Sequence, residues 1–467
     1  MSSKYEQGLP QHIHMVGIGG IGLSAIARVL SAWGHEVTGS DLVASAATRA
    51  LNDLGIRTYV GHAAKQVKGA GMVVISSAVP ENNPEIQAAR EWGIPVVKRQ
   101  DLLGRMMAGR RGVAVAGTHG KTTTSAMIAH MLEQAMLSPT FIVGGIVGGL
   151  NTNARAGNGA HFVIEADEYD RMFHGLNPQI AVVTNVEMDH PDCYRDIDDM
   201  REAYAEFLDR VPADGYIVAC SDSPHLVGLL SGRAPRVVTY GTGEGAAFRV
   251  SGVRANARGG IDFNITTAAG PWGGYSLSVP GVHNALNATA ALISAELCGL
   301  DRFLASRHLR VYGGVLRRFE LKGERSGVTV VDDYAHHPTE VRATLAAARQ
   351  RYPERRIWAV FQPHTYSRAS ALLGDLATCF EGADRVLVTD IYAARSRESA
   401  TIRAEDIVAA VNHNDARYIG GIDDAVRCLL DEMRAGDVLL TLGAGDGYLI
   451  GERVLAGLAE RGNDGRA

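Results

Sequence analysis

The segment Gly117–Thr123 constrains the fold of this chain most, because it places a glycine-rich turn between an apolar strand and a helix. Residues 113–116 predict the strand, and residues 122–135 predict the helix. In such a loop, glycines let backbone N–H groups approach phosphate oxygens, a lysine adds positive charge, and the helix N-terminus favours an anion. Val115 stands where the usual motif has its first glycine, so a plain glycine-rich turn is the competing interpretation. The predicted nucleotide-binding residues of this loop are Gly117, Thr118, His119, Gly120, Lys121, Thr122 and Thr123.

Acidic residues follow two predicted strands in the same region. Glu165–Asp170 and Asn185–His190 each come directly after a short apolar run. Carboxylates at the carboxyl end of a strand, near a phosphate loop, are where Mg²⁺ is usually held. The sequence therefore predicts a magnesium site formed by the segment Glu165–Asp170 and the Thr122 hydroxyl, with the ring of His190 as a candidate ligand of a second metal ion. Helix-capping carboxylates and a structural histidine are the alternatives.

An earlier glycine loop, Gly17–Gly22, has the spacing G-x-G-x-x-G between a predicted strand and a predicted helix. Asp41 follows at the end of the next strand, which completes the pattern of a dinucleotide-binding fingerprint. The pattern suits any diphosphate at a helix N-terminus, so it leaves NAD and a nucleotide-sugar open. Ser76, after another strand, either lines the same cleft or belongs to a turn before Pro80.

Strands and helices alternate along the whole chain of 467 residues, which indicates α/β domains with mainly parallel sheets. We expect three such domains, at residues 1–110, 111–320 and 321–467. The stretch 241–274, rich in Gly, Ala and Thr, predicts an antiparallel addition to the second sheet.

Composition narrows the classes of function. The net charge of −5 argues against a basic surface built for nucleic acid. Five widely spaced cysteines without a CxxC pair indicate a reduced, cytoplasmic protein. The polar start of the chain predicts no secretion signal, and no apolar run is long enough to predict a membrane span.

Several separated motifs together resemble the Mur ligases of peptidoglycan synthesis, over essentially the whole chain. Besides the two glycine loops and the two acidic segments, the resemblance rests on Pro280–Asn287, Leu316–Glu320, Asp332–Pro338 and Phe361–His364. It implies a Rossmann-like first domain, a central ATPase-like domain with a mainly parallel sheet, and a Rossmann-like third domain. It also implies an ATP-dependent ligase that requires Mg²⁺ and forms an amide through an acyl phosphate.

The resemblance further implies roles for individual residues. Lys121 would hold the β- and γ-phosphates, Thr122 and Glu168 one Mg²⁺, and Glu168 with His190 another. On the nucleotide, Asn284 and Asn287 would meet the adenine, Asp333 the ribose and Arg318 the γ-phosphate. The incoming amino acid would meet Tyr334, His336 and Arg368, with His336 as a candidate base. A UDP-sugar would lie in the first domain, at Gly19, Gly20, Gly22, Asp41 and Ser76.

Departures from the family pattern point to one branch. Other Mur ligases carry a metal-bridging carbamylated lysine just after the position of His190, but residues 191–210 contain no lysine. This agrees with the alanine-adding branch, whose substrates are UDP-N-acetylmuramate and L-alanine. Thr365 stands where relatives often have arginine, which leaves Arg368 as the better partner for the amino-acid carboxylate. Tyr169 replaces a frequent serine. The branch implies a cytoplasmic enzyme of cell-wall synthesis, linked to cell shape and division, with no obligate protein partner.

Other interpretations stay open at this point. A Mur ligase that reattaches a recycled peptide to the same UDP-sugar shares most of these motifs. A nicotinamide-dependent oxidoreductase would explain Gly17–Gly22 and Asp41, and a P-loop switch without catalysis would explain the Lys121 loop. Locally, His336–Pro338 could simply cap a helix, and Arg317 with Arg318 could form a solvated linker.

Overall fold

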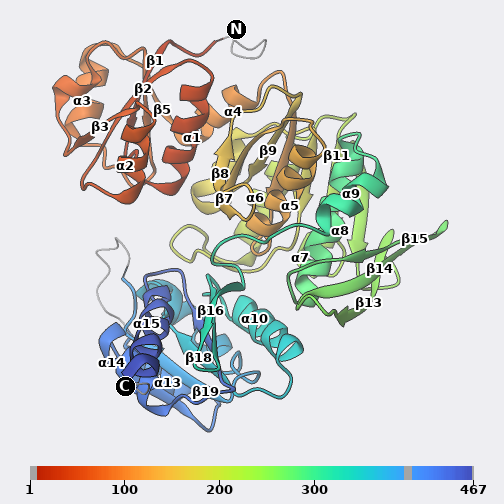
Figure 1. Cartoon of the computed structure of the whole chain (residues 1–467). Coiled ribbons are helices and arrows are strands. Elements are labelled where there is room, and N and C mark those ends of the chain that lie inside the picture. The colour runs from red at the N-terminus through yellow and green to blue at the C-terminus, as the bar shows by residue number, and fades with distance from the viewer. Residues whose placement is uncertain (1–7, 394–401, 465–467) are drawn as a thin grey trace. The chain divides into compact units, whose positions relative to one another are not determined.

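The structure is a computed structural model that describes residues 8–393 and 402–464. Its strands form three sheets, which Figure 1 shows with their helices. No helix in these described ranges has the length and apolar character needed to cross a membrane. The chain divides into two compact units, of which the first comprises Met1–Glu187, Ile197–Arg249 and Asn287–Leu309, and the second comprises Met188–Asp196, Val250–Leu286 and Arg310–Ala467.

The first sheet has five parallel strands in the order β3-β2-β1-β4-β5. Because the order reverses beside β1, the glycine loop after β1 lies at the switch point where such sheets bind ligands. The strands are β1 (His12–Val16), β2 (Glu36–Asp41), β3 (Arg57–Val60), β4 (Met72–Ile75) and β5 (Val96–Lys98). The helices are α1 (Ile21–Ala32), α2 (Ala46–Asp53), the 3₁₀ helix η1 (Ala64–Val67), α3 (Pro84–Glu91) and α4 (Arg99–Met107).

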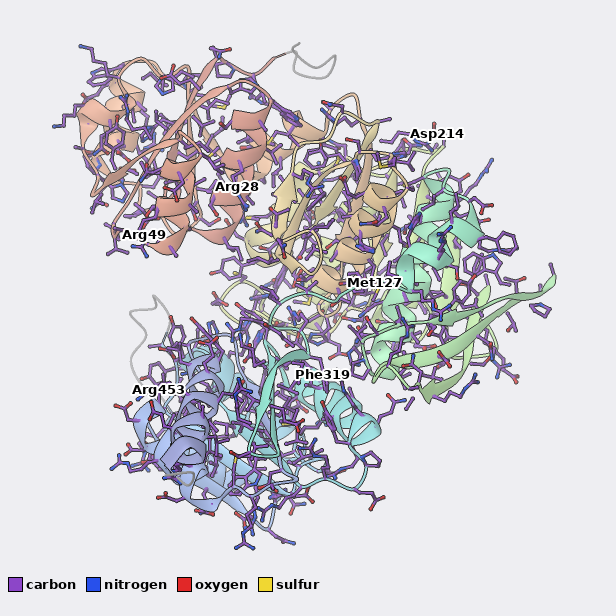
Figure 2. All side chains as sticks on the ribbon, in the orientation of Figure 1. Arg28, Arg49, Met127, Asp214, Phe319 and Arg453 are labelled. Atoms are coloured by element: carbon purple, nitrogen blue, oxygen red, sulfur yellow. The ribbon has the colours of Figure 1, made fainter. Side chains whose placement is uncertain are left out.

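The second sheet carries the phosphate loop. Within the first unit its strands lie in the order β12-β11-β10-β6-β9-β7-β8, parallel except for β8 at the edge. The strands are β6 (Arg111–Ala116), β7 (Thr140–Val147), β8 (Thr152–Arg155), β9 (His161–Glu165), β10 (Ile180–Val183), β11 (Tyr216–Cys220) and β12 (Arg236–Gly241). The helices are α5 (Lys121–Gln134), the 3₁₀ helix η2 (Tyr169–Gly175), α6 (Ile197–Leu208), α7 (Pro224–Val227), α8 (Val282–Leu297) and α9 (Arg302–Leu309). Met127 on α5, labelled in Figure 2, is fully buried, so the helix after the loop is anchored in the core.

Three further strands follow, β13 (Phe248–Ala255), β14 (Ile261–Thr267) and β15 (Gly270–Ser276). β14 and β15 pair antiparallel, as the composition of residues 241–274 predicts. The first residues of β13 pair parallel with β12, so that the start of this addition is not antiparallel.

The third sheet has the order β16-β17-β21-β18-β19-β20, with only β16 antiparallel. Successive residues of its strands pack into different core clusters: Ile357, Ala359 and Phe361 belong to one, and Trp358 and Val360 to the other. This alternation means that both faces of the sheet are covered. The strands are β16 (Glu320–Arg325), β17 (Val328–Asp333), β18 (Ile357–Phe361), β19 (Arg385–Thr389), β20 (Ala416–Gly420) and β21 (Val438–Leu442). The helices are α10 (Pro338–Arg351), α11 (Tyr366–Ala371), α12 (Leu373–Leu376), α13 (Ala404–Ala410), α14 (Ile422–Glu432) and α15 (Tyr448–Asp464).

Candidate active site

Two glycines shape the loop between β6 and α5. Gly117 has φ +132°, and a Cβ there would lie 1.9 Å from the Thr184 hydroxyl oxygen. Gly120 has φ +83° at the N-cap of α5, and a Cβ there would lie 2.5 Å from the Asn287 side-chain oxygen. Both positions require glycine, for conformation and for space. The loop therefore packs closely against the end of β10 and against α8, where the predicted adenine residue Asn287 lies.

The segment after β10 holds the middle of the loop. The backbone N–H groups of Thr118 and His119 donate to the Asn185 carbonyl (3.1 Å) and side-chain oxygen (2.9 Å). The Thr118 hydroxyl donates to the Glu187 carbonyl (3.1 Å) and accepts its N–H (2.9 Å). His119 Nε2 lies 3.3 Å from Glu187 Oε2. Thr118 and His119 thus hold the loop against the segment after β10. Lys121 and Thr122, the first two residues of α5, follow directly.

Lys121 sits in the loop with a carboxylate beside it. Its Nζ donates to the carbonyls of Gly117 (2.6 Å) and Thr118 (3.0 Å), and to Glu168 Oε1 (2.8 Å). The Glu168 side chain is fully buried. A charge-assisted hydrogen bond is stronger in surroundings of low dielectric constant. These three hydrogen bonds therefore fix the position of the Lys121 ammonium group beside the loop.

Electrostatics keep Lys121 charged. Burial disfavours its ammonium form, but the carboxylates of Glu168, Glu165 and Asp167 outweigh this effect and raise its pKa above the ordinary value. Burial raises the pKa of Glu165, although Lys121 and the Thr122 hydroxyl favour its charged form. Glu165 Oε2 also accepts the N–H of Gly144 (2.7 Å).

The oxygen groups around Lys121 fit a magnesium ion. Thr122 offers a hydroxyl, and Glu165 and Glu168 offer carboxylates, which are the hard ligands that Mg²⁺ prefers. Glu165 was part of the predicted acidic segment, but its contact with Thr122 appears only in the structure. His190 belongs to the second compact unit, so its pairing with Glu168 stays a prediction.

The first glycine loop uses backbone and carboxylate groups. The N–H groups of Gly17 and Ile18 donate to the Ser40 carbonyl (2.8 and 3.0 Å), and Gly19 N–H donates to Asp41 Oδ2 (2.9 Å). Asp41 is thereby bound to the loop itself. A Cβ at Gly17 would lie 3.5 Å from the Ser76 Cβ, so Ser76 lies beside the loop. That it lines a binding cleft there stays a prediction.

Arg99, which sequence analysis missed, reaches this loop from the start of α4. A Cβ at Gly22 would lie 2.0 Å from Arg99 Nη1, so the guanidinium occupies the space that glycine leaves. Arg99 Nη2 also lies 3.3 Å from Asp167 Oδ2, and Nε lies 3.2 Å from the Met172 sulfur. The only signal in the sequence is a single arginine after a short strand, which is too common to single out.

In the second unit, Asp333 ends β17 and organises the chain on either side. Its Oδ2 accepts Phe319 N–H and its Oδ1 accepts Ala335 N–H, both at 2.8 Å. Burial raises the pKa of Asp333 to about 6, against the opposing effect of Arg318. Arg318 Nη1 lies 3.7 Å from Glu340 Oε1. Asn284, at the start of α8, donates to the Pro280 carbonyl (2.7 Å).

The residues predicted for the amino acid gather between β17 and α11. His336 Nδ1 lies 3.0 Å from the Tyr334 carbonyl and 3.4 Å from Glu340 Oε2, and its ring is 5.8 Å from that of His364. Burial lowers the pKa of His336 to about 3, so its ring is neutral near pH 7. The capping role falls to its neighbour: His337 Nδ1 accepts Thr339 N–H (3.2 Å) at the start of α10.

Arg368 is held by an acidic group that sequence analysis did not single out. Its Nε donates to Asp189 Oδ1 (2.8 Å), and its Nη atoms lie 3.3 Å from His364 Nδ1 and 3.2 Å from His190 Nδ1. Burial opposes the Asp189 carboxylate, but His190 and Arg368 outweigh it and lower its pKa. Asp189 and His190 are thus linked to the amino-acid residues in the same unit. Thr365, the residue before α11, has φ +59°, and its short side chain carries no positive charge for the amino-acid carboxylate.

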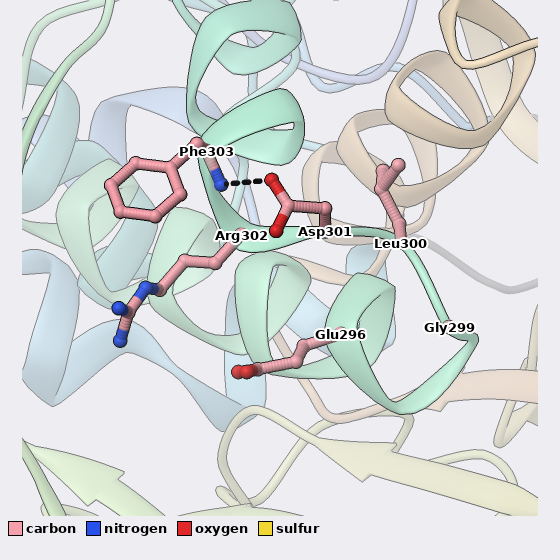
Figure 3. A pocket seen from close by; sticks show the side chains of 6 residues that line it. All are labelled: Glu296, Gly299, Leu300, Asp301, Arg302 and Phe303. Atoms are coloured by element: carbon pink, nitrogen blue, oxygen red, sulfur yellow. Dashed lines mark hydrogen bonds between the residues drawn. The ribbon is translucent and has the colours of Figure 1, made fainter.

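A separate hollow of about 400 Å³, shown in Figure 3, lies where α8 meets α9 and contains none of the predicted residues. Phe303 N–H donates to Asp301 Oδ1 there (2.9 Å). The hollow is lined by Glu296, Gly299, Leu300, Asp301, Arg302 and Phe303.

Comparison with known proteins decides the family. Family models match three successive parts of the chain: the Mur ligase catalytic domain at residues 12–111, the Mur ligase middle domain at 115–295, and the Mur ligase glutamate ligase domain at 317–445. The chain belongs to the Mur ligase family. The family resemblance is therefore confirmed. Because Mur ligases are ATP-dependent, the nicotinamide-dependent alternative is set aside.

Relatives match along nearly the full length. A UDP-N-acetylmuramate–L-alanine ligase of Acidobacterium capsulatum is 45% identical over 436 residues, covering 93% of this chain and 95% of that relative. The crystal structure of UDP-N-acetylmuramate-alanine ligase from Thermotoga maritima is 29% identical, with a TM-score of 0.80 and coverage of 96% and 99%. A murein peptide ligase from Psychrobacter arcticus is 25% identical, with a TM-score of 0.71 and the same coverage. The predicted Mur ligase fold with three α/β domains is confirmed.

Proposed function

We infer that this chain is an ATP-dependent ligase that joins the carboxylate of UDP-N-acetylmuramate to the amino group of L-alanine. The observation that carries this inference is 45% identity, over nearly the whole length, to a relative of that name. The ion pair of Lys121 with the buried Glu168 in the phosphate loop supports this inference, because such a ligase needs a fixed cation beside the ATP phosphates.

A carboxylate is a poor acceptor for an amine until it is activated. Transfer of the γ-phosphoryl group from ATP to the sugar carboxylate gives an acyl phosphate and ADP. The amine then attacks the acyl carbon, the amide forms, and phosphate leaves with the former carboxylate oxygen. In the first step we assign Lys121 to the β- and γ-phosphates, where its fixed ammonium group offsets the charge that develops. Arg318 would add a second positive charge.

We propose that Thr122, Glu165 and Glu168 hold Mg²⁺. The ion, when bound, would neutralise phosphate charge and orient the nucleotide. A second ion through His190 is part of the proposal. Asn284 and Asn287 lie three residues apart on α8, and therefore on one face, where both would meet the adenine. Asp333 would bind the ribose.

We propose that the UDP-sugar lies on the loop Gly17–Gly22, with its diphosphate at the N-terminus of α1. Gly19, Gly20 and Gly22 would let the diphosphate approach the backbone closely, and Asp41, which accepts the Gly19 N–H, would line the cleft with Ser76. Arg99 supports this proposal because it brings a guanidinium group to a loop that has no cation of its own.

The amino acid would bind in the second unit, with its carboxylate on Arg368 and its amine near Tyr334 and His336. A neutral His336 can accept a hydrogen bond from the amine. With a pKa of about 3 it holds a proton weakly, so it would orient the amine and pass the proton on to solvent.

Remaining parts of the proposal concern organisation and setting. We propose domain boundaries at 1–110, 111–320 and 321–467, which the three sheets support. We also propose that the enzyme works in the cytoplasm, in peptidoglycan synthesis and hence in cell shape and division. Its partners would be its small-molecule substrates, without nucleic acid, membrane or an obligate protein.

The likeness to a murein peptide ligase keeps one second candidate, ligation of a peptide to the same UDP-sugar. The test is phosphate release from ATP and Mg²⁺ with UDP-N-acetylmuramate, plus L-alanine, a peptide or neither. We expect release that requires both the sugar and L-alanine. Release with the peptide but not with L-alanine would favour the second candidate, and release without any amine would favour a nucleotide switch.

A further inference from the structure

We propose that Arg317 is a positioning residue: it ties the turn between β21 and α15 to the end of β17, and thereby sets Arg318, Asp333 and Tyr334 for ATP and the amino acid. The proposal rests on the function inferred above. It replaces the interpretation of Arg317 as half of a solvated linker pair, because the Arg317 side chain is only 24% exposed.

The guanidinium group of Arg317 uses each of its nitrogens. Nε donates to Asp332 Oδ2 (2.9 Å), whose side chain is 1% exposed. Nη1 donates to the Gly445 carbonyl (3.1 Å), and Nη2 donates to the Gly443 carbonyl (2.8 Å). One rigid fork therefore joins a strand end to two points of a turn, which a flexible ammonium group would not reproduce.

Two aromatic rings flank the same guanidinium group. Its carbon lies 5.1 Å from the centre of the Tyr334 ring and 4.7 Å from that of Tyr448, the first residue of α15. The Arg318 guanidinium carbon lies 5.2 Å from the Tyr334 ring. Tyr334, a proposed contact of the amino acid, is thus placed by both arginines through cation–π attraction.

The backbone next to Arg317 is held in an unusual shape. Arg317 and Phe319 both have left-handed conformations, with φ of +62° and +48°. The Arg317 carbonyl accepts Tyr334 N–H (2.7 Å), and Phe319, labelled in Figure 2, donates its N–H to Asp333. Left-handed residues persist only where surrounding contacts hold them. Arg318 lies between the two, so the direction of its side chain depends on these contacts.

The turn that Arg317 grips is itself closely packed. A Cβ at Gly445 would lie 2.3 Å from Gln362 Oε1 and 2.6 Å from the Tyr392 ring, so the backbone approaches both. The Gln362 amide donates to Asp446 Oδ1 (2.7 Å) and accepts Gly447 N–H (2.9 Å). The Gly443 and Gly445 carbonyls are therefore held in place as hydrogen-bond acceptors for Arg317. Through Arg317, the end of β17 is held against this turn.

Arg355 is a matched control in the same sheet. It donates to the carbonyls of Gly436 (2.7 Å), Gly327 (3.1 Å) and Asp437 (2.8 Å), and its guanidinium carbon lies 5.3 Å from the Tyr352 ring. Its carbonyl and aromatic contacts resemble those of Arg317 but lie at the other ends of β17 and β21. Arg317 has in addition the buried Asp332 carboxylate, and it is Arg317 that adjoins the proposed site residues.

The test compares Arg317→Ala, Arg317→Lys and Arg355→Ala in the full chain, by steady-state kinetics, melting temperature and calorimetric titration with ATP and Mg²⁺. For Arg317→Ala we expect kcat to fall roughly 10- to 100-fold, because small displacements in such a site are costly. We expect KM for ATP and L-alanine to rise about tenfold, and KM for the UDP-sugar to stay within about twofold, because the UDP-sugar binds elsewhere.

Arg317→Lys keeps the charge but not the forked guanidinium group, so the same kinetic constants should change in the same direction by smaller factors. It replaces Arg317→Ala in the test if that variant folds poorly. Arg355→Ala should also lower the melting temperature, while its kinetic constants stay within about twofold. Equal kinetic losses for Arg317 and Arg355 variants, or a loss in melting temperature alone at Arg317, would overturn the proposal. Failure of the wild type to use L-alanine would instead refute the inferred function, whereas its ATP titration still tests Arg317.

Discussion

The two glycine loops of the first unit have the same architecture, a parallel strand, a turn and a helix, but different charged groups. The loop after β6 contains its own cation, Lys121, which is paired with the buried Glu168. The loop after β1 contains no cation, gives one N–H to Asp41, and receives Arg99 from α4. The backbone motif alone therefore predicts only phosphate binding. We propose that the surrounding side chains decide whether a loop holds a substrate or takes part in phosphoryl transfer.

The largest effect should come from removing the internal cation. Lys121→Met is expected to lower kcat roughly 10³-fold or more, because the charge developing on the phosphoryl group loses its fixed partner. Affinity for the UDP-sugar, measured by calorimetry, should stay unchanged. Lys322→Met, which removes a Lys–Glu pair between β16 and α15 (Nζ to Glu452 Oε1 2.9 Å), is the control and should retain activity. Retained turnover in Lys121→Met would remove the distinction between the loops.

The second effect concerns the buried carboxylate. Glu168→Gln keeps the shape but removes a charged oxygen ligand, so the Mg²⁺ concentration for half-maximal rate should rise roughly 10- to 100-fold. A magnesium titration at saturating ATP measures it. An unchanged midpoint would mean that Glu168 only partners Lys121.

A smaller effect is expected at the first loop. In Gly22→Ala the new Cβ would displace the Arg99 guanidinium, and the loss of one charge-assisted hydrogen bond should raise KM for the UDP-sugar roughly 10-fold. KM for ATP should not change. Gly245→Ala, where a Cβ meets no atom within 4 Å, is the matched control. If KM for ATP rose instead, the division of labour between the loops would be wrong.

The smallest effect is expected at Asp41. Asp41→Asn keeps an oxygen that accepts Gly19 N–H, so KM for the UDP-sugar should change less than about threefold. Asp41→Ala leaves that N–H without its acceptor and should have the larger effect. A large loss in Asp41→Asn would show that the carboxylate charge itself contacts the substrate.

Much of the fold follows from local pattern. The strand predicted at residues 113–116 lies within β6, and the helix predicted at residues 122–135 agrees with α5 to within one residue at each end. The edge strands β3 and β20 give no such signal, because their side chains are mostly part-exposed and show no hydrophobic period. Being edges, they are defined by pairing with a neighbour rather than by their own sequence.

The site shows the same limit. The residue types in the Lys121 loop and the acidic segment after β9 indicate their chemistry without a structure. Arg99 could not be found in this way, and the sequence did not show the contacts of Asp189 and Arg317, because each of the three contacts residues far along the chain. Their partners are chosen by the fold, and a single arginine or aspartate carries no local signature.

The most direct test of the central claim follows the carboxylate oxygen. UDP-N-acetylmuramate labelled with ¹⁸O in its lactoyl carboxylate would be incubated with ATP, Mg²⁺ and L-alanine, and the released phosphate analysed by mass spectrometry. The account predicts one labelled oxygen in each phosphate released, and only when L-alanine is present. Alanine-dependent phosphate without label would contradict activation of the carboxylate by phosphorylation.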